Sequence, residues 1–326
     1  MLRSLRTVDR DVNAVLDPIR LGLSVPQAFA MLLLRRPRAI FATGGYVAVP
    51  VLLSAWVLRI PVVMWEGNVV PGRAVRWTAP LARALAVSFR ATCATLGPRK
   101  PCFYTGTPIR NPGAIDRTDA RTRLGLGPND RLLLIFGGSQ AVRRFNQAVA
   151  EALPRLVEQV RVLHVTGDAG HDAALAARSA LPENLRDRYR PERFLYDEMD
   201  AALAAADVVI GRAGSSTLAE VAAFGLPMIV VPYPHAAGHQ RRNAEEMARA
   251  GAARLVEDRD FGPETLLAAA AIARNDNERE AMAAAARSLA RPGAAAAVAA
   301  LVLAAAERRP LPSTEEIDAI ARGAGA

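Results

Sequence analysis

The sequence predicts an α/β protein with parallel sheets, organised as two domains. Short apolar runs bounded by Gly and Pro alternate along the chain with longer helical stretches, which is the pattern of repeated strand–helix–strand units. The chain has 326 residues, which exceeds the usual size of a single domain. Hydrophobic residues make up 51% and charged residues 22%, a composition typical of globular proteins with well-filled cores.

Six apolar runs are expected to form strands. In chain order they cover residues 39–43, 61–65, 132–136, 161–167, 206–210 and 227–233. The apolar stretch Val47–Met64 is interrupted by Pro50, Arg59 and Pro61, so it predicts a helix followed by a strand rather than a membrane span. The stretch Gly293–Ala306 is too short to cross a bilayer and predicts a helix packed on a core.

A polar segment rich in Gly and Pro, 111–130, separates the first two predicted strands from the last four. We interpret it as the linker between an N-terminal domain, 1–110, and a C-terminal domain, 131–292. Residues 309–326, which include Pro310, are expected to form a loosely ordered tail.

The charge balance narrows the class of partner. Lys and Arg number 41 against 32 Asp and Glu, a net charge of +9, which favours anionic partners. Aromatic residues make up only 5% and no nucleic-acid-binding motif is present, so nucleic acid is not expected as a partner. An anionic membrane surface or a phosphorylated substrate fits better, although an Arg-rich, Ala-rich composition from a GC-rich genome would also explain the charge.

Cysteine usage and the N-terminus both indicate the cytoplasm. Cys93 and Cys102 form no C-x-x-C pair and are not expected to form a disulfide framework, which indicates a reducing compartment. Residues 1–17 alternate charged with apolar residues and lack the apolar segment of a signal peptide.

Glycine-rich loops follow three of the predicted strands. They are Gly44-Gly45-Tyr46, Glu66-Gly67-Asn68 and Gly137-Gly138-Ser139-Gln140. Ligands of parallel sheets bind at the carboxyl ends of the strands, where glycine lets the backbone approach them. Any one of these loops could be a simple tight turn, but together they predict a ligand-binding edge.

The loop after the fifth run, "GRAGSSTLAE" from Gly211 to Glu220, consists mostly of small residues where a strand gives way to a helix. Unpaired N–H groups at the start of a helix and the helix dipole favour a phosphate there. Glu220, further along the helix, could accept hydrogen bonds from a ribose, so a nucleoside diphosphate is the predicted ligand. Alternatively, Ser215 caps the helix and Glu220 completes a capping box, as in helices that bind nothing.

The longer stretch "GRAGSSTLAEVAAFGLPMIVVPYPHAAGHQRRNAEEMARAGAA" resembles the UDP-sugar-binding region of the MurG family. The motifs "FATGGYVAVP", "PVVMWEGNVVPG", "TGTPIR" and "FGGSQAVRRFN" resemble further family motifs in the same order, and the likeness runs from about Pro37 to Ala304. The resemblance implies an inverting transfer of N-acetylglucosamine from UDP-GlcNAc to lipid I, the undecaprenyl-diphospho-muramoyl-pentapeptide. The product is lipid II, and the step belongs to peptidoglycan synthesis, cell-wall growth, cell division and cell shape.

The fold implied by the resemblance is GT-B, two Rossmann-like domains whose parallel sheets face each other across a cleft. The helix at 293–308 would return to pack on the N-terminal domain. No cofactor and no metal are implied, because enzymes of this fold generally work without a metal-held diphosphate. The implied partners are UDP-GlcNAc, a lipid-linked acceptor and the anionic surface of the inner membrane, with peripheral binding at the cytoplasmic face.

Site residues are implied by position in the family motifs. Residues expected around the donor, from the nucleotide and diphosphate to the ribose, sugar and uracil, are Arg110, Ser139, Gln140, Gly214, Ser215, Ser216, Thr217, Glu220, His239, Gln240 and Tyr196. Tyr46, Glu66 and Asn68 are expected on the acceptor side.

The sequence departs from the family pattern in its first part. The family begins with a G-G-T-G-G-H loop whose His is the favoured catalytic base, and no such segment is present, so the N-terminal domain is expected to be incomplete. The four histidines all lie in the second half of the chain, which leaves Glu66 as the candidate base. Two alternatives stay open: a non-catalytic UDP-GlcNAc-binding remnant, and a related GT-B glycosyltransferase with another acceptor.

Overall fold

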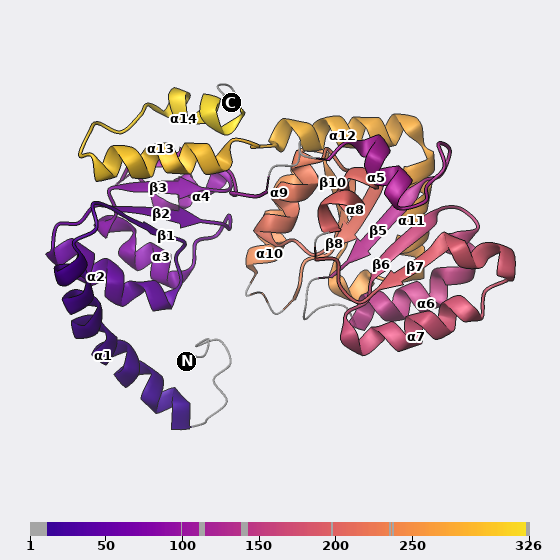
Figure 1. Ribbon diagram of the computed structural model, residues 1–326, viewed down its shortest axis with the longest axis horizontal. Coiled ribbons are helices and arrows are strands. Elements are labelled where there is room, and N and C mark those ends of the chain that lie inside the picture. The colour runs from indigo at the N-terminus through magenta and orange to yellow at the C-terminus, as the bar shows by residue number, and fades with distance from the viewer. Residues whose placement is uncertain are drawn as a thin grey trace. The chain divides into compact units, whose positions relative to one another are not determined.

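The computed structural model describes residues 12–98, 100–110, 115–137, 143–196, 198–234, 236 and 238–323, with side chains from residue 20 onward except residue 21. It contains two compact units (Figure 1). The first unit joins Met1–Pro108 to Gly293–Ala326, and the second is Ile109–Pro292. Each unit has its own parallel sheet, which makes the protein the α/β type that the alternating pattern predicts.

The sheet of the first unit has four parallel strands in the order β1-β2-β3-β4. They are β1 (Ile40–Ala42), β2 (Val62–Glu66), β3 (Ala84–Val87) and β4 (Cys102–Tyr104). Because consecutive strands are parallel neighbours, each connection crosses over a face of the sheet, and all the carboxyl ends lie at one edge. The loops after β1 and β2 are the first two glycine-rich loops of the sequence.

Helices α1 (Val12–Arg35), α2 (Val49–Val57) and α3 (Arg73–Thr78) belong to one face of this sheet, and α4 (Arg90–Leu96) joins β3 to β4. Their apolar side chains and those of the sheet form one buried cluster, which includes Leu32, Leu52, Ala55, Val75, Val62, Met64 and Leu85.

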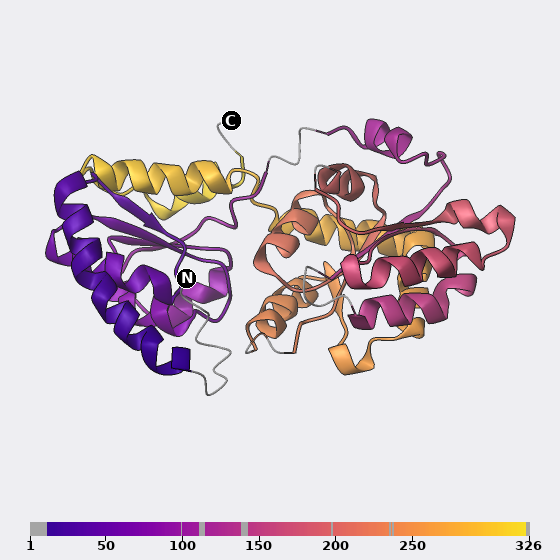
Figure 2. The same cartoon turned by 60° about the horizontal axis from the view of Figure 1, so that its bottom comes forward.

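Two C-terminal helices, α13 (Ala294–Ala306) and α14 (Thr314–Ala321), pack on the sheet of the first unit, as Figures 1 and 2 show. Their buried cluster contains Ala297, Val298, Leu301, Ile317, Val63, Ala86 and Phe103. The expectation of a loosely ordered tail is therefore wrong for residues 314–321, which form α14. A capping box between Ser313 and Glu316 starts α14, and burial of Ile317 holds the helix on the sheet.

The stretch Asp276–Ala306 is long and apolar enough to cross a membrane by length and composition. It contains two helices, α12 (Asp276–Leu289) and α13, separated by a break that includes Pro292. The two helices belong to different units, and the buried side chains of α13 face the sheet of the first unit. These contacts are those of core helices.

The second unit has a six-stranded parallel sheet in the order β10-β9-β8-β5-β6-β7. Its strands are β5 (Leu132–Phe136), β6 (Arg161–Val165), β7 (Tyr189–Glu192), β8 (Val208–Gly211), β9 (Met228–Val230) and β10 (Ala253–Leu255). Strands β8, β5 and β6 are neighbours within the sheet and are buried along nearly their whole length, as expected for a sheet covered on both faces.

Helices cover this sheet on both sides. They are α5 (Arg117–Arg123), α6 (Arg143–Val157), α7 (Asp168–Ser179), α8 (Met199–Ala205), α9 (Ser215–Ala223), α10 (His239–Arg249), α11 (Pro263–Arg274) and α12. A large buried cluster lies between the sheet, α6 and α11, where the tilted rings of Phe145 and Phe261 have centroids 4.5 Å apart.

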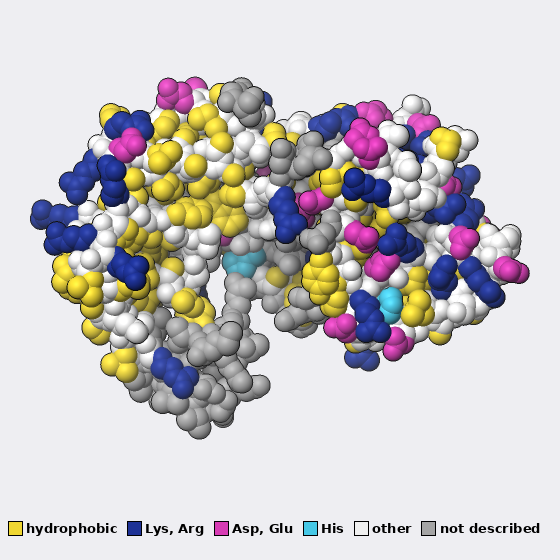
Figure 3. Space-filling model, viewed as in Figure 1, with side chains coloured by type: hydrophobic (Ala, Val, Ile, Leu, Met, Phe, Trp, Pro, Cys, Tyr) yellow, Lys and Arg dark blue, Asp and Glu magenta, His cyan; other side chains and the backbone are white. Residues whose placement is uncertain are grey.

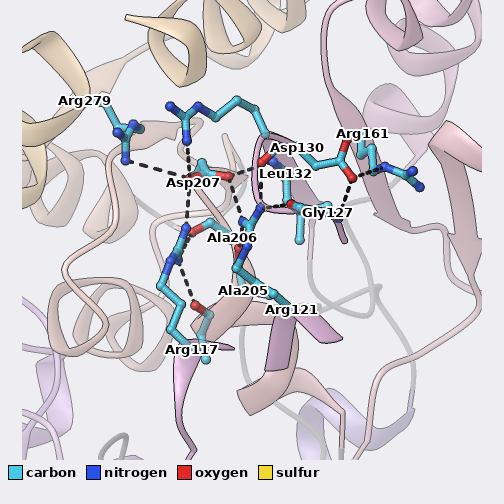
Figure 4. Close-up of polar contacts among 12 residues, drawn as sticks. Arg117, Arg121, Gly127, Asp130, Leu132, Arg161, Ala205, Ala206, Asp207 and Arg279 are labelled. Atoms are coloured by element: carbon cyan, nitrogen blue, oxygen red, sulfur yellow. Dashed lines mark hydrogen bonds and ion pairs between the residues drawn. The ribbon is translucent and has the colours of Figure 1, made fainter. Parts of the chain in front are cut away.

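The segment expected to link the domains is instead part of the second unit over 115–130, because a buried carboxylate holds it there (Figure 4). Asp207, at the amino end of β8, has a fully buried side chain. Its Oδ1 accepts from Arg117 on α5 at 2.8 Å, and its Oδ2 accepts from the backbone N–H of Leu132 at 2.8 Å and from Arg121 at 3.4 Å. These bonds fix α5 to the amino edge of the sheet, opposite the ligand edge.

The interpretation of the two cysteines is also wrong. Cys93 on α4 and Cys102 at the start of β4 form a disulfide, with Cα atoms 5.7 Å apart. The turn between the helix and the strand brings the two side chains together, and their spacing of nine residues matches none of the short motifs from which pairing is predicted.

All six predicted strands are present in the structure, and it contains four more among the described residues. The additional strands are β3, β4, β7 and β10. Their sequences are short, alanine-rich or polar, as in "ALAV" and "YRPE", so hydrophobic periodicity and β propensity do not reveal them.

Candidate functional site

The carboxyl ends of β5, β8 and β9 are neighbours in the second unit, because these strands are adjacent in the sheet. The loops that follow them are the ones predicted to bind the donor. Ser139 and Gln140, in the loop after β5, lie outside the described residues. The site is therefore built from the loops after β8, β9 and β7.

The loop after β8 leads directly into α9. Gly214 is the N-cap residue, with φ −67° and ψ 142°, and Ser215, Ser216 and Thr217 are the first three residues of the helix. The backbone N–H groups in the first turn of a helix point out of its end, where the helix dipole favours negative charge, so this end suits an anion. The capping-box alternative is wrong. The N-cap residue is Gly214, which has no side chain to accept a hydrogen bond, and Glu220 lies beyond the N3 position, which is Thr217.

Glu220 lies one turn further along α9 and is half-buried. Burial raises the pKa of the Glu220 carboxyl, the nearby charge of Asp200 raises it further, and Arg110 lowers it. Two residues expected in the donor site, Arg110 and Glu220, are thus close enough to interact although 110 positions separate them. A half-buried carboxylate beside a helix N-terminus suits a sugar hydroxyl next to a phosphate.

The loop after β9 ends at α10, where Gly238 adopts φ +77° as the N-cap residue. His239 and Gln240 are the first two residues of α10. The Oε1 atom of Gln240 accepts a hydrogen bond from the backbone N–H of Tyr233 at 2.9 Å. This bond fixes the side chain of Gln240 and leaves its amide NH2 group to donate. His235, in the same loop, lies outside the described residues.

Two buried polar residues beneath these loops were missed as site residues. Asn243 on α10 is fully buried, and its Nδ2 donates to the carbonyl of Ala213 at 3.2 Å. Arg212, directly after β8, is 7% exposed and pairs with Asp258. Asn243 lies four residues after His239, on the same helix face, and that spacing is the one sequence signal that could have identified it.

Tyr196 follows β7 and is exposed, with its ring 5.9 Å from that of Phe194. Both residues line a surface pocket of about 450 Å³ together with Asp168, His171, Glu192 and Arg193. The pocket lies at the carboxyl end of β6 and β7, at the same edge of the sheet as α9. It offers aromatic surface for a flat ring, and the structure shows no interaction between Tyr196 and Glu220.

In the first unit, the loop after β1 depends on two glycines with positive φ, Gly44 at +78° and Gly45 at +85°. A Cβ atom on Gly44 would lie 2.7 Å from Cγ2 of Val75, so this position requires glycine on two counts. The turn places Tyr46 at the start of the short helix that leads into α2.

Glu66 ends β2 and organises the loop that follows it. Its side chain is 7% exposed, and Oε1 accepts from the backbone N–H of Asn68 at 2.9 Å and from Asn68 Nδ2 at 3.0 Å. Oε2 accepts from the backbone N–H of Gly72 at 3.1 Å. Thr92 on α4 donates to the Asn68 carbonyl at 3.0 Å. Glu66 and Asn68 therefore form one hydrogen-bonded unit, in which both carboxylate oxygens hold backbone N–H groups.

His164 is the most buried of the described histidines, at 1% exposed, and its Nδ1 lies 3.0 Å from the Tyr189 hydroxyl. Burial lowers the pKa of His164 to about 3, so this imidazole is neutral near pH 7. Its place in the core makes it a structural residue. Among the described residues, no group of three or more His, Cys, Asp or Glu side chains could hold a metal ion.

Family models match both parts of the chain. The glycosyltransferase family 28 C-terminal domain matches residues 132–298, and the N-terminal domain of the same family matches residues 7–87. The chain is similar to the UDP-N-acetylglucosamine–N-acetylmuramyl-(pentapeptide) pyrophosphoryl-undecaprenol N-acetylglucosamine transferase of Moorella thermoacetica. The two are 39% identical over 297 residues, which are 89% of this chain and 80% of the relative. The transferase of the same name from Desulforudis audaxviator is 36% identical over 81% of this chain and 72% of its own length.

Solved structures agree with this likeness. The crystal structure of Acinetobacter baumannii MurG superposes with a TM-score of 0.73 at 28% identity, covering 88% of this chain and 79% of that protein. A UDP-GlcNAc 2-epimerase from Neisseria meningitidis superposes with a TM-score of 0.57 at 11% identity, covering 81% of this chain and 75% of its own, which is a likeness of fold alone. The architecture is GT-B, with two Rossmann-like domains.

Proposed function

Because this chain belongs to the MurG family of glycosyltransferases, we propose that it is a hexosyltransferase that forms lipid II in peptidoglycan synthesis. It transfers N-acetylglucosamine from UDP-GlcNAc to lipid I with inversion. The observation that carries the proposal is helix α9, which starts directly after β8 at Ser215, Ser216 and Thr217 and carries the half-buried Glu220 further along. A helix N-terminus suits the donor's phosphates, and a carboxylate suits the hydroxyls of its ribose.

The start of α9 and Arg110 are placed to stabilise the departing UDP. The reaction places negative charge on the diphosphate as the anomeric bond breaks, so positive charge and N–H donors must already face it. The N-terminus of α9 supplies aligned backbone dipoles, and Arg110 supplies a full charge next to Glu220. Gln240, whose Oε1 is held by Tyr233, is left to donate to a sugar hydroxyl.

On the acceptor side, Glu66 is the carboxylate that the sequence offers as base. Its hydrogen bonds to Asn68 and Gly72 support a different role, in which Glu66 shapes the loop that receives the acceptor. These three N–H bonds engage both oxygens of the carboxylate.

The test is transfer of radiolabelled N-acetylglucosamine from UDP-GlcNAc to a lipid I analogue, with calorimetric titration of UDP-GlcNAc on the same sample. Transfer together with binding supports the proposal. Binding without transfer to lipid I or to any other polyprenyl-linked sugar would support the non-catalytic alternative. A folded protein that binds neither UDP-GlcNAc nor UDP would contradict the donor assignment.

Exposed apolar residues in the first unit favour contact with a membrane surface. They lie on α1, η1 (Tyr46–Ala48), β1, α2 and α3 and comprise Leu23, Met31, Leu33, Leu34, Phe41, Val47, Leu53, Trp56, Val57 and Trp77. Exposed arginines of the same elements and the adjoining turns are Arg35, Arg36, Arg38, Arg59, Arg73 and Arg76. Figure 3 shows hydrophobic and basic side chains at the surface of this unit.

Tryptophan beside arginine suits the interface between lipid headgroups and acyl chains, and anionic lipids attract the arginines. Trp77 is 84% exposed and lies on α3 between Arg76 and the end of the helix, while Trp56 is 60% exposed on the adjacent α2. We therefore place the enzyme peripherally at the cytoplasmic leaflet, where its lipid-linked acceptor lies. Arg83 and Arg90 do not belong to this surface, because they contact Arg309 and Asp318 of the C-terminal segment.

Vesicle co-sedimentation tests this placement. Binding to anionic vesicles, weakened by salt and by Trp56→Gln or Trp77→Gln, is the expected result. The matched control is Leu303→Gln, since Leu303 is an exposed apolar residue of the first unit on α13, at 55% exposure. Equal binding to neutral vesicles, or an equal loss with the control, would contradict the proposal.

A further inference from the structure

Arg212 is a buried arginine that links the two loops around the donor site. It follows the last residue of β8 and precedes Ala213 and Gly214, which lead into α9. Its guanidinium donates from Nη1 to the carbonyls of Val231 at 3.3 Å and Pro232 at 3.4 Å, both in the loop after β9. One side chain thus connects the phosphate-facing loop to the sugar-facing loop.

The charge of Arg212 is already neutralised within the protein. Nη1 lies 2.5 Å from Oδ1 of Asp258, whose side chain is 19% exposed. The guanidinium also lies over the Phe145 ring at 4.6 Å and the Tyr233 ring at 5.5 Å. An arginine held by a carboxylate, two carbonyls and two rings is fixed in one orientation, and its planar fork suits such a site better than a lysine would.

Two further bonds lie near Arg212: one ties the same two loops together, and the other holds Gln240 to the loop after β9. Asn243 of α10 donates to the carbonyl of Ala213, the residue next to Arg212. Tyr233, which lies against the guanidinium, donates its backbone N–H to Gln240. The position of Gln240 relative to the first turn of α9 therefore depends on contacts that converge on Arg212.

We propose that Arg212 is a positioning residue for nucleotide-sugar selection: it sets the spacing between the N-terminus of α9 and Gln240, and so couples phosphate binding to sugar recognition. This inference rests on the proposed function. The obvious alternative is that Arg212 binds the diphosphate directly. Replacing Asp258 distinguishes these two roles of Arg212. A phosphate ligand would gain free charge when Asp258 is neutralised, whereas a positioning residue would lose its anchor.

The experiment measures the dissociation constants of UDP, UDP-GlcNAc and UDP-glucose for the intact chain and for Arg212→Lys and Asp258→Asn. Arg259→Gln is the matched control, because Arg259 adjoins Asp258 but its side chain is 84% exposed. We expect both site variants to weaken UDP-GlcNAc binding about 10-fold to 100-fold, the usual effect of losing a charge-assisted hydrogen bond. Both should also reduce the preference for UDP-GlcNAc over UDP and UDP-glucose, while the control changes neither.

Equal losses for all three ligands with Arg212→Lys, together with tighter binding in Asp258→Asn, would overturn the inference in favour of a phosphate ligand. Unchanged affinity and selectivity in both variants would overturn it outright. If Arg212→Lys does not fold, Asp258→Asn and Tyr233→Leu carry the same test, with circular dichroism to confirm their folding. Failure of the unaltered chain to bind UDP-GlcNAc would contradict the proposed function, so the two failures are distinguishable.

Discussion

Asn68 donates both its backbone N–H and its side-chain amide to a single oxygen of Glu66, at 2.9 and 3.0 Å. The other oxygen of Glu66 accepts from Gly72, so one carboxylate closes the loop between β2 and α3. Because of this arrangement, kinetics of a Glu66 variant can distinguish a catalytic base from a residue that holds the acceptor loop.

In Glu66→Gln, the amide nitrogen faces an N–H donor, and the loop should open. We expect the KM for the lipid-linked acceptor to rise about tenfold, with the KM for UDP-GlcNAc unchanged. Thr92→Val removes a further bond to Asn68 and should act in the same direction. Steady-state kinetics with each substrate varied measures both. A loss of about 10² to 10⁴ in kcat for Glu66→Gln alone would instead identify Glu66 as the base.

Replacing Glu220 should weaken the donor site without destabilising the protein. Burial raises the pKa of Glu220, so its ionised form is disfavoured in the folded state, and this cost grows as pH rises above the usual carboxyl pKa. Glu220→Gln should therefore unfold at an equal or higher temperature at pH 7, while UDP binding weakens by about 1–3 kcal/mol. Calorimetric titration and thermal unfolding measure the two effects, with the exposed Glu264→Gln as control. Unchanged UDP affinity would remove Glu220 from the site.

His164 should make the protein sensitive to mild acid. Burial lowers its pKa from 6.5 to about 3, so the unfolded chain binds a proton that the folded chain excludes. The stabilising effect is complete above pH 6.5, and about 1.4 kcal/mol is lost for each pH unit below it, until the pH approaches 3. Urea unfolding between pH 7 and 5 measures this slope. In His164→Gln, which can still bond Tyr189, the slope should be shallower by about that amount; an identical slope would contradict the assignment.

Asp207 should contribute much more to stability than its charged neighbour Asp276. Both contact Arg131 and Arg279, but the Asp207 side chain is fully buried whereas that of Asp276 is 68% exposed. Asp207→Asn should lower the free energy of unfolding by about 2–4 kcal/mol, because it leaves several arginines without their buried carboxylate. Asp276→Asn should cost less than about 1 kcal/mol. Denaturant unfolding of both variants gives the comparison, and equal losses would contradict a special role for the buried carboxylate.

Several features of this protein follow from local sequence, because they depend on neighbouring residues. The apolar runs predicted six of the strands, and the small residues after "ADVVI" predicted the start of α9. The alternative that Ser215 caps this helix was also an inference from neighbouring residues. It is wrong because the N-cap residue is Gly214, and Ser215 is the first residue of the helix.

Only the tertiary structure decided the relationships between distant residues. Arg212 and Asp258 are 46 positions apart, and Arg117 and Asp207 are 90 apart, so no sequence period could pair them. The alanine-rich β3 is a strand because its neighbours in the sheet bury it, and α14 is ordered because the face of the first sheet receives Ile317. Local sequence determines where many strands and helix starts occur. The packing free energy depends on residues far apart in the chain, and it decides which polar groups are buried together. These buried contacts determine what each carboxylate and arginine can do.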